Sequence, residues 1–214
     1  MNKSLIANGF VVINNGLDLN GLNSYWLVKN EIISEEDLRG NHIFTSNFIQ
    51  LSLNKFSLTL NNNSVILSIN NNYNEQDYIE GVNKLIFLLT KLKNTLNLSC
   101  GINFNWILND LNGGEYFEIS KKLFFVNDNP LYKEFENNRP CFGAYMSKDF
   151  EDSRLKLDIK PVHSNLDGIN EGTLHFNFNF HKDLVDSTSI DELEAYLKKW
   201  KIYKNESELL VNKI

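Results

Sequence analysis

The sequence predicts an α+β fold built on a mostly antiparallel sheet, with helices packed on one face. Two segments alternate between apolar and polar residues: 173–182 (TLHFNFNFHK) without exception, and 101–109 (GINFNWILN) with Ile107 on the polar side. Successive side chains of a strand point to opposite faces, so each segment has one apolar face for a core and one polar face for solvent. A sheet covered on both faces would show continuous apolar runs instead.

The first half of the chain is expected to hold an irregular segment and then a block of strands ending in a helix. Residues 1–40 are rich in Asn and Gly around one strand at 25–33. In the block 41–98, the alternation over 47–60 changes phase at Lys55, which predicts one long strand with a bulge or bend. Residues 61–63 form a turn and 65–70 the returning strand. Asn74 then caps a helix whose apolar residues recur at helical spacing.

The second half repeats this order of strands followed by a helix, over residues 99–204. A helical insertion is expected at 113–138, with one helix over 116–124 and another opened by Asn129 and Pro130. Strands follow at 141–148, 154–162 and 173–182. Ser189 and Glu192 form a capping box for the last helix, and 205–214 is a short peripheral tail. Little residue identity supports a duplication, and we expect one compact domain made of two meanders.

Length and cysteine usage predict an intracellular protein with a full core. A compact chain of 214 residues buries roughly 70% of its unfolded surface and needs no disulfide framework. Cys100 and Cys141 are expected to be reduced, buried thiols. Residues 1–16 imitate a signal peptide, but Asn8 and Gly9 interrupt the apolar run. No run reaches the ~18 apolar residues of a membrane span, so we expect a cytoplasmic protein.

Charge and composition bear on the partner and the source. A net charge of −6 and a pI near 5.3 argue against nucleic acid as a partner, because its binders usually show a basic excess. The chain has 34 Asn but three Ala and three Arg, a bias toward A- and T-rich codons that predicts a bacterial or phage genome of low GC content. Asn is therefore a weak indicator of a site in this chain.

Common catalytic and cofactor motifs are absent from the sequence. It has no G-x-G-x-x-G, Walker loop, H-E-x-x-H, G-x-S-x-G or C-x-x-C, which disfavours dinucleotide folds, P-loop enzymes and the common hydrolases. His175 and His181 share a strand face but lie about 20 Å apart, too far for one metal ion. His42 and His163 lack a carboxylate or cysteine at a ligand spacing. We expect neither a metal nor a cofactor.

One pattern has mechanistic content. Asp158, Ile159 and Lys160 lie on a predicted strand, with Asp149 and Asp152 just upstream across a turn. Within residues 149–160 this resembles the PD-(D/E)xK nucleases, although their Pro-Asp dipeptide is missing. The resemblance implies that the acids bind Mg²⁺ and that the lysine activates water. The simpler interpretation is cross-strand charge pairing on a solvated sheet.

The polar faces of the predicted strands offer a binding surface. If the strands at 101–109, 154–162 and 173–182 are neighbours, one surface carries Asp158 and Lys160 together with the binding candidates Asn103, Asn105, Lys156, His175, Asn177 and Asn179. That surface has no aromatic residue for base stacking. On the helix opened by Asn74, Phe87 and Leu88 flank the polar stripe. They are covered either by another element or by a partner.

These observations favour a non-catalytic cytosolic subunit that acts through protein contacts. We expect a protein partner or self-association, with neither nucleic acid nor membrane, in a bacterial or phage toxin–antitoxin, antiviral or anti-defence system. Two alternatives stay open. One is an Mg²⁺-dependent nuclease-like enzyme using Asp158, Lys160 and Asp149, and the other is small-ligand or peptide binding on the polar sheet face.

Overall fold

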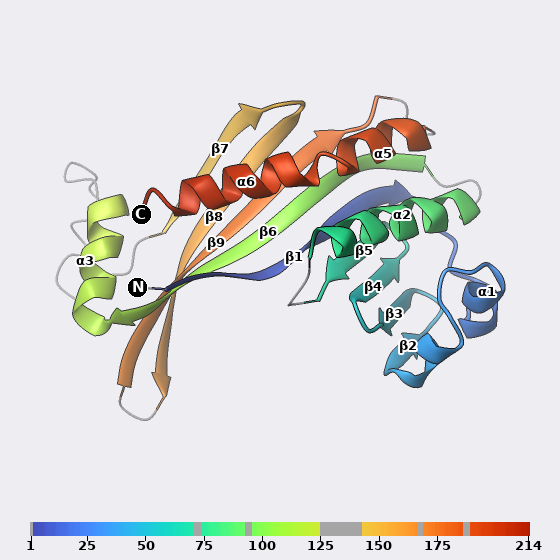
Figure 1. Cartoon of the computed structure of the whole chain (residues 1–214), viewed down its shortest axis with the longest axis horizontal. Coiled ribbons are helices and arrows are strands. Elements are labelled where there is room, and N and C mark those ends of the chain that lie inside the picture. Colours follow the sequence, from blue (N-terminus) through green and yellow to red (C-terminus); the bar gives the residue numbers. More distant parts are fainter. Residues whose placement is uncertain (1, 71–73, 93–95, 125–142, 167–168, 186–188) are drawn as a thin grey trace.

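A single antiparallel sheet organises the molecule. The structure is a computed structural model that describes residues 2–70, 74–92, 96–124, 143–166, 169–185 and 189–214. Within these ranges nine strands form one sheet, and α2, α5 and α6 lie along one of its faces (Figure 1). The predicted α+β class with a mostly antiparallel sheet is confirmed.

The elements follow the chain in two blocks. The first block contains β1 (Asn2–Asn15), α1 (Ser24–Lys29), the 3-10 helix η1 (Glu36–Arg39), β2 (His42–Phe44), β3 (Phe48–Ser52), β4 (Phe56–Asn61), β5 (Ser64–Ile69) and α2 (Glu75–Lys91). The second contains β6 (Leu96–Asn112), α3 (Gly113–Phe124), β7 (Ala144–Phe150), β8 (Ser153–Leu166), β9 (Ile169–Asp183), α5 (Ile190–Leu197) and α6 (Trp200–Val211).

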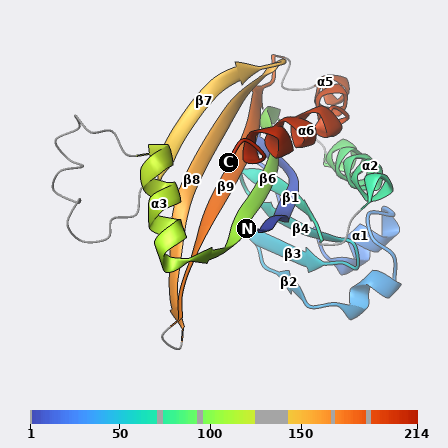
Figure 2. The ribbon, with the colours of Figure 1, turned by 60° about the vertical axis from the view of Figure 1, so that its left-hand side comes forward.

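The two blocks have the same strand order around a shared centre. The order across the sheet is β2-β3-β4-β5-β1-β6-β9-β8-β7, so the first strands of the blocks, β1 and β6, pair with each other. In each block the last strand returns to pair with the first, β5 with β1 and β9 with β6. The sheet is therefore arranged with approximate two-fold symmetry about the β1–β6 pair, and it twists strongly along its width (Figure 2).

The segment expected to be irregular contains the central strand β1. Phe10 and Val12 are fully buried on its helix-covered face, but Asn8 occupies the preceding core-facing position and breaks the apolar alternation. Register shifts between Leu5 and Ala7 and between Ile13 and Asn14 change the phase twice more. Because of these interruptions the sequence pattern does not indicate β1, although β1 is stabilised by pairing with β5 on one edge and β6 on the other.

Two further predictions in the first block are wrong. The strand expected at 25–33 is replaced by α1, whose N-cap Asn23 accepts a hydrogen bond from the Trp26 backbone N–H at 2.9 Å. The single long strand expected over 47–60 is a hairpin, with Ser52 paired to Ser57. The phase change at Lys55 marks a tight turn, closed by the Leu53 N–H bonded to the Phe56 carbonyl at 2.8 Å.

Helix α2 has the predicted cap and packs closely on the sheet. Asn74 and Asp77 form a reciprocal capping box, which satisfies two backbone donors of the first turn. At Gly81 a Cβ atom would lie 3.2 Å from the Leu67 Cδ2 and 3.3 Å from the Phe56 Cε1. Glycine at this position allows the helix axis to approach the strands.

The second block agrees with the sequence where it is described. β6 and β9 contain the two alternating segments, with Phe104 paired to Phe178 and Trp106 to Phe176 on the core side. The expected helix at 116–124 is the end of α3, which begins at Gly113. The expected helix at Asn129 and Pro130, the first residues of the strand at 141–148 and Cys141 lie outside the described residues.

The end of the chain differs from its prediction. Instead of one helix and a peripheral tail over 205–214, two helices follow β9, and α6 extends to Val211. Ser207 and Val211 are buried, and the Ser207 hydroxyl accepts a hydrogen bond from the indole N–H of Trp106 at 3.0 Å. The charged residues that alternate with apolar ones after Tyr203 made the buried side of α6 hard to recognise in the sequence.

One hydrophobic core joins both blocks between the sheet and the helices. It includes Phe10 and Leu67 from the first block and Phe104, Phe178 and Leu193 from the second. No helix in the described ranges has the length and apolar character needed to cross a membrane. The opposite side of the sheet carries mostly polar side chains, together with apolar ones such as Val11, Ile66 and Ile107, and we call it the polar face.

Candidate functional site

The polar face brings together the predicted binding residues. Asn103 lies opposite Asn179, and Asn105 opposite Asn177, across β6 and β9. On the other side of β9, Asn179 faces Lys156 of β8 and His175 faces Lys160. The predicted six binding residues therefore share one surface, as the strand alternation required.

Several of these side chains keep their hydrogen-bonding groups available. The Asn179 amide donates to the Asn103 carbonyl oxygen at 2.6 Å. Asn105 and Asn177 have no side-chain hydrogen bond, and Lys156 no ion pair, within the part of the chain that the structure describes. All three are partly exposed. The centre of the face thus presents unused amide donors, amide acceptors and one ammonium group.

A row of polar residues, interrupted by Gly9, extends the face over eight strands. The register aligns one row from β3 to β7, consisting of Ser52, Ser57, Ser68, Gly9, Asn103, Asn179, Lys156 and Ser147. At Gly9 a Cβ atom would lie 2.4 Å from the Leu67 carbonyl oxygen, so this position requires glycine. At about 4.8 Å per strand, the row is on the order of 35 Å long.

The charged residues of the face are largely paired with one another. Lys160 contacts the Asp158 carboxylate at 2.5 Å, and Arg154 contacts Asp149 at 2.8 Å. Asp149 is opposite Arg154, four residues along β8 from Asp158, which separates the two acids by about 13 Å. The register therefore does not bring the nuclease candidates Asp149, Asp158 and Lys160 around one ion. No group of three metal-ligating side chains occurs within the described ranges.

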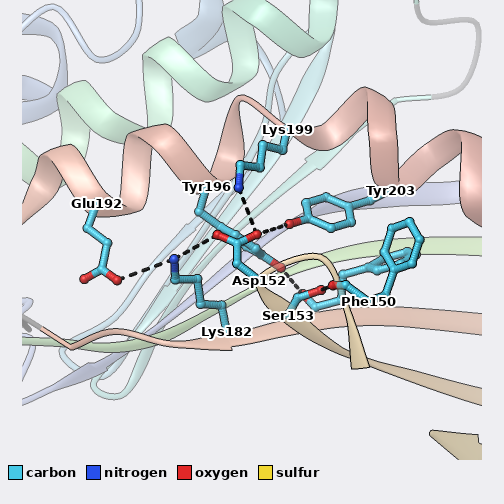
Figure 3. Close-up of polar contacts among 9 residues, drawn as sticks. Phe150, Asp152, Ser153, Lys182, Glu192, Tyr196, Lys199 and Tyr203 are labelled. Atoms are coloured by element: carbon cyan, nitrogen blue, oxygen red, sulfur yellow. Dashed lines mark hydrogen bonds and ion pairs between the residues drawn. The ribbon is translucent and has the colours of Figure 1, made fainter. Parts of the chain in front are cut away.

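A second polar cluster, which the sequence did not predict, lies on the helix-covered side (Figure 3). Its centre is Asp152, in the β7–β8 turn. The Asp152 carboxylate accepts a hydrogen bond from the Tyr203 hydroxyl at 2.8 Å and contacts Lys199 at 3.0 Å and Lys182 at 3.0 Å. Lys182 also approaches Glu192 at 3.5 Å. The cluster ties a hairpin turn to β9, α5 and α6.

The pKa shifts in this cluster keep Asp152 and Lys182 charged and the Tyr203 hydroxyl protonated. Partial burial raises the pKa of Asp152, but hydrogen bonds from Lys182, Tyr203 and Lys199 outweigh it and bring the pKa well below the ordinary value. Burial lowers the pKa of Lys182, and contact with Asp152 more than reverses this. Burial and the bond to Asp152 raise the pKa of the Tyr203 hydroxyl. The arrangement stabilises a fixed carboxylate whose oxygens accept from three donors, which suits attachment of the helices to the sheet.

The two residues of α2 predicted to form an interface, Phe87 and Leu88, differ in their exposure. Phe87 is 37% exposed, and its ring lies 5.0 Å from the Lys91 ammonium. Leu88 is fully buried in the core of this chain, so its assignment to a partner surface is corrected. Successive side chains of a helix point about 100° apart around its axis, so Phe87 is exposed while Leu88 faces the core.

Cys100 matches the expectation for a buried, reduced thiol. It is a free cysteine with 1% exposure on the core side of β6. Burial raises the pKa of this thiol to about 12, so it stays protonated and unreactive at neutral pH.

Sequence comparison adds no relative: no protein-family model matches the chain, and no curated protein is significantly similar to it. The functional interpretation therefore depends on the geometry of the polar face and of the helix-covered side.

Proposed function

We propose that the protein is a non-catalytic binding protein that contacts another protein through the polar face. The observation that carries this proposal is the row across eight strands, which is polar except at Gly9. Beside its middle lie Asn105 and Asn177, whose amides have no hydrogen-bond partner among the described residues. Helices on the other face give the sheet a rigid backing. A rigid, pre-formed surface reduces the entropy cost of association.

The charges of the face support a protein partner. Arg154 and Lys160 are matched by Asp149 and Asp158, and the chain as a whole is acidic. A polyanion would gain little from paired cations, because its affinity comes mainly from neutralising phosphates. The Asn side chains of the face each offer a hydrogen-bond donor and an acceptor. The backbone and polar side chains of a partner protein can pair with both.

The wider setting is a further part of the proposal. The bias toward Asn and against Ala and Arg supports a bacterial or phage source with an A- and T-rich genome. We place the protein in a toxin–antitoxin, antiviral or anti-defence system. The genes beside its own are the direct check on this part.

Site-specific photocrosslinking in the host cell tests the proposed surface. A photoreactive phenylalanine analogue replaces Ser57 or Lys156, each one strand in from an end of the row, and Lys198, the C-cap residue of α5, serves as the control position. We expect the same protein, identified by mass spectrometry, to be crosslinked from both face positions and not from Lys198. Crosslinking from Lys198 alone, or of unrelated proteins from the two face positions, would contradict the proposal.

Paired substitutions then measure the contribution of the amides. Asn105→Arg with Asn177→Arg places two bulky charges at the centre of the face. We expect affinity for the crosslinked protein to fall at least tenfold, since like charges and unpaired groups are costly in an interface. The matched control is Asn83→Arg with Asn212→Arg, which lie within α2 and at the C-cap of α6 and are both exposed. Equal binding by both double variants would remove the polar face from the interface.

A further inference from the structure

A cleft on the helix-covered side has the properties of a small-molecule site. It lies between the start of α2 and α6, above the ends of β1 and β6, and its volume is about 670 Å³. Ligand pockets usually measure about 300–1,000 Å³ and often lie where two substructures meet. Here α2 comes from the first block and α6 from the second. The cleft is on the opposite side of the sheet from the polar face.

The cleft is lined by fixed aromatic rings. Tyr78 and Trp200 are stacked, with ring centroids 3.9 Å apart and planes 6° from parallel. Trp106 is held by its hydrogen bond to Ser207 at 3.0 Å. All three rings line the cleft and are largely buried. Such pre-ordered planar groups favour a ligand that is itself flat.

A buried amide without a partner among the described residues lies on β1, two residues beyond the cleft-lining Ile6. Asn8 is 4% exposed, and neither its amide nitrogen nor its carbonyl oxygen has a hydrogen-bond partner among the described residues. Along β1 it is the next core-facing position after Leu5 and Ile6, which line the cleft, and it pairs with Phe104, two residues from Trp106. A buried polar group left unpaired costs about 1–3 kcal/mol, so its presence requires an explanation.

The wall between the cleft and Asn8 includes the irregular part of β1. The register shifts between Leu5 and Ala7, so Ile6 has no opposite residue on β6. A bulge residue is held by fewer ladder bonds than its neighbours. Displacement of Ile6 would open the cleft toward the Asn8 amide.

The rim of the cleft is neutral. Lys201 bridges from α6 to Glu75 on α2 at 2.9 Å, and Lys204 pairs with Glu208 at 3.3 Å. Lys201 and Glu75 are each 58% exposed, and exposed pairs contribute only about 0–1 kcal/mol. These groups can exchange partners for ligand hydroxyls. Because each lysine is matched by a carboxylate, an uncharged ligand fits the rim better than a phosphate.

We propose that this cleft binds an uncharged planar heterocycle whose edge carries an adjacent donor and acceptor, which is the chemistry of a nucleobase or its nucleoside. The ring packs against Tyr78, Trp106 and Trp200, and the edge pairs with Asn8. An Asn side chain makes two hydrogen bonds at once to such an edge. Ligand binding thereby satisfies the two polar groups of the Asn8 amide, which have no partner among the described residues.

Tryptophan fluorescence tests the proposal directly, because two of the three tryptophans line the cleft. The full chain is titrated separately with adenosine, guanosine, cytidine and uridine. We expect at least one nucleoside to change the emission saturably, and the Trp26→Phe variant to keep this response. A linear, non-saturating response to all four nucleosides up to millimolar concentration would overturn the proposal.

Asn8→Leu separates recognition from folding. Leucine has a similar volume and removes the unpaired amide, so we expect this variant to melt at a higher temperature than the wild type and to bind the nucleoside at least tenfold more weakly. Unchanged affinity in a folded Asn8→Leu protein would remove the amide from recognition and overturn the proposal. Trp106→Phe is the second variant. It keeps a ring in place, and unchanged binding there would likewise contradict the assigned cleft.

Discussion

At the scale of single residues, Asp152 shows how the fold joins side chains that the sequence keeps apart. Lys182, Lys199 and Tyr203 come from β9 and from the region where α5 meets α6, and all three reach one carboxylate in a two-residue turn. No local spacing signals such a cluster, because its members are brought together only by the packing of the last helices. The predicted face residues differ in this respect, since they follow directly from alternation within strands.

Asp152→Asn is expected to destabilise the protein by about 1–2 kcal/mol at pH 7, because it removes the charge that three donors contact. Hydrogen bonds lower the pKa of Asp152 in the folded state. Its contribution is therefore complete above the unfolded pKa of about 3.9 and is lost as pH falls through the lower folded value. Urea unfolding at pH 7 and at pH 3 should show the difference between wild type and variant shrinking in acid.

Asp149→Asn is the control for this measurement, since Asp149 is 87% exposed and has one surface partner. Its effect should stay within about 0.5 kcal/mol at either pH. An Asp152→Asn variant as stable as the Asp149→Asn variant at pH 7 would show that the cluster does not anchor the helices.

At the scale of elements, strict periodicity and caps were predictive, and interrupted patterns were not. The alternating segments became the cores of β6 and β9, and the Asn74 cap opened α2. β1 was missed because a buried Asn and two bulges disturb its alternation. The β3–β4 hairpin resembles one strand in its sequence pattern because its turn is only two residues long. α1 shows that local apolar content alone does not distinguish a strand from a helix.

Helix α2 provides a matched pair of neighbouring residues for a stability test. Leu88→Glu buries a carboxylate in the core and should cost more than about 3 kcal/mol or prevent folding. Phe87→Glu alters an exposed ring and should change the free energy of unfolding by less than about 1 kcal/mol. Urea denaturation of both variants checks this. Similar losses for the two would mean that α2 is rotated on the sheet relative to the arrangement described above.

At the scale of the whole molecule, the two blocks share strand order, a central strand pair and one core. Pairing of β1 with β6 runs from Asn2 to Asn15, so neither block has a complete sheet without the other. The core cluster likewise contains residues of both. The sequence indicated two similar blocks but not their relation, because pairing between distant strands leaves no local pattern.

This shared centre predicts that both blocks unfold together. Differential scanning calorimetry should show one transition, with a calorimetric enthalpy equal to the van't Hoff enthalpy. Two resolved transitions, or a van't Hoff enthalpy near half the calorimetric value, would show that the blocks are independent folding units.

The central position of β1 also constrains the order of events during synthesis. One edge of this strand finds β5 within the first block, but the other edge must wait until β6 has left the ribosome. At about 5–20 residues per second the delay is on the order of seconds. During that time the nascent chain presents an unpaired strand edge and half of its apolar layer, which are the features that chaperones recognise and that drive aggregation. Slow translation between β5 and β6 would lengthen this exposure.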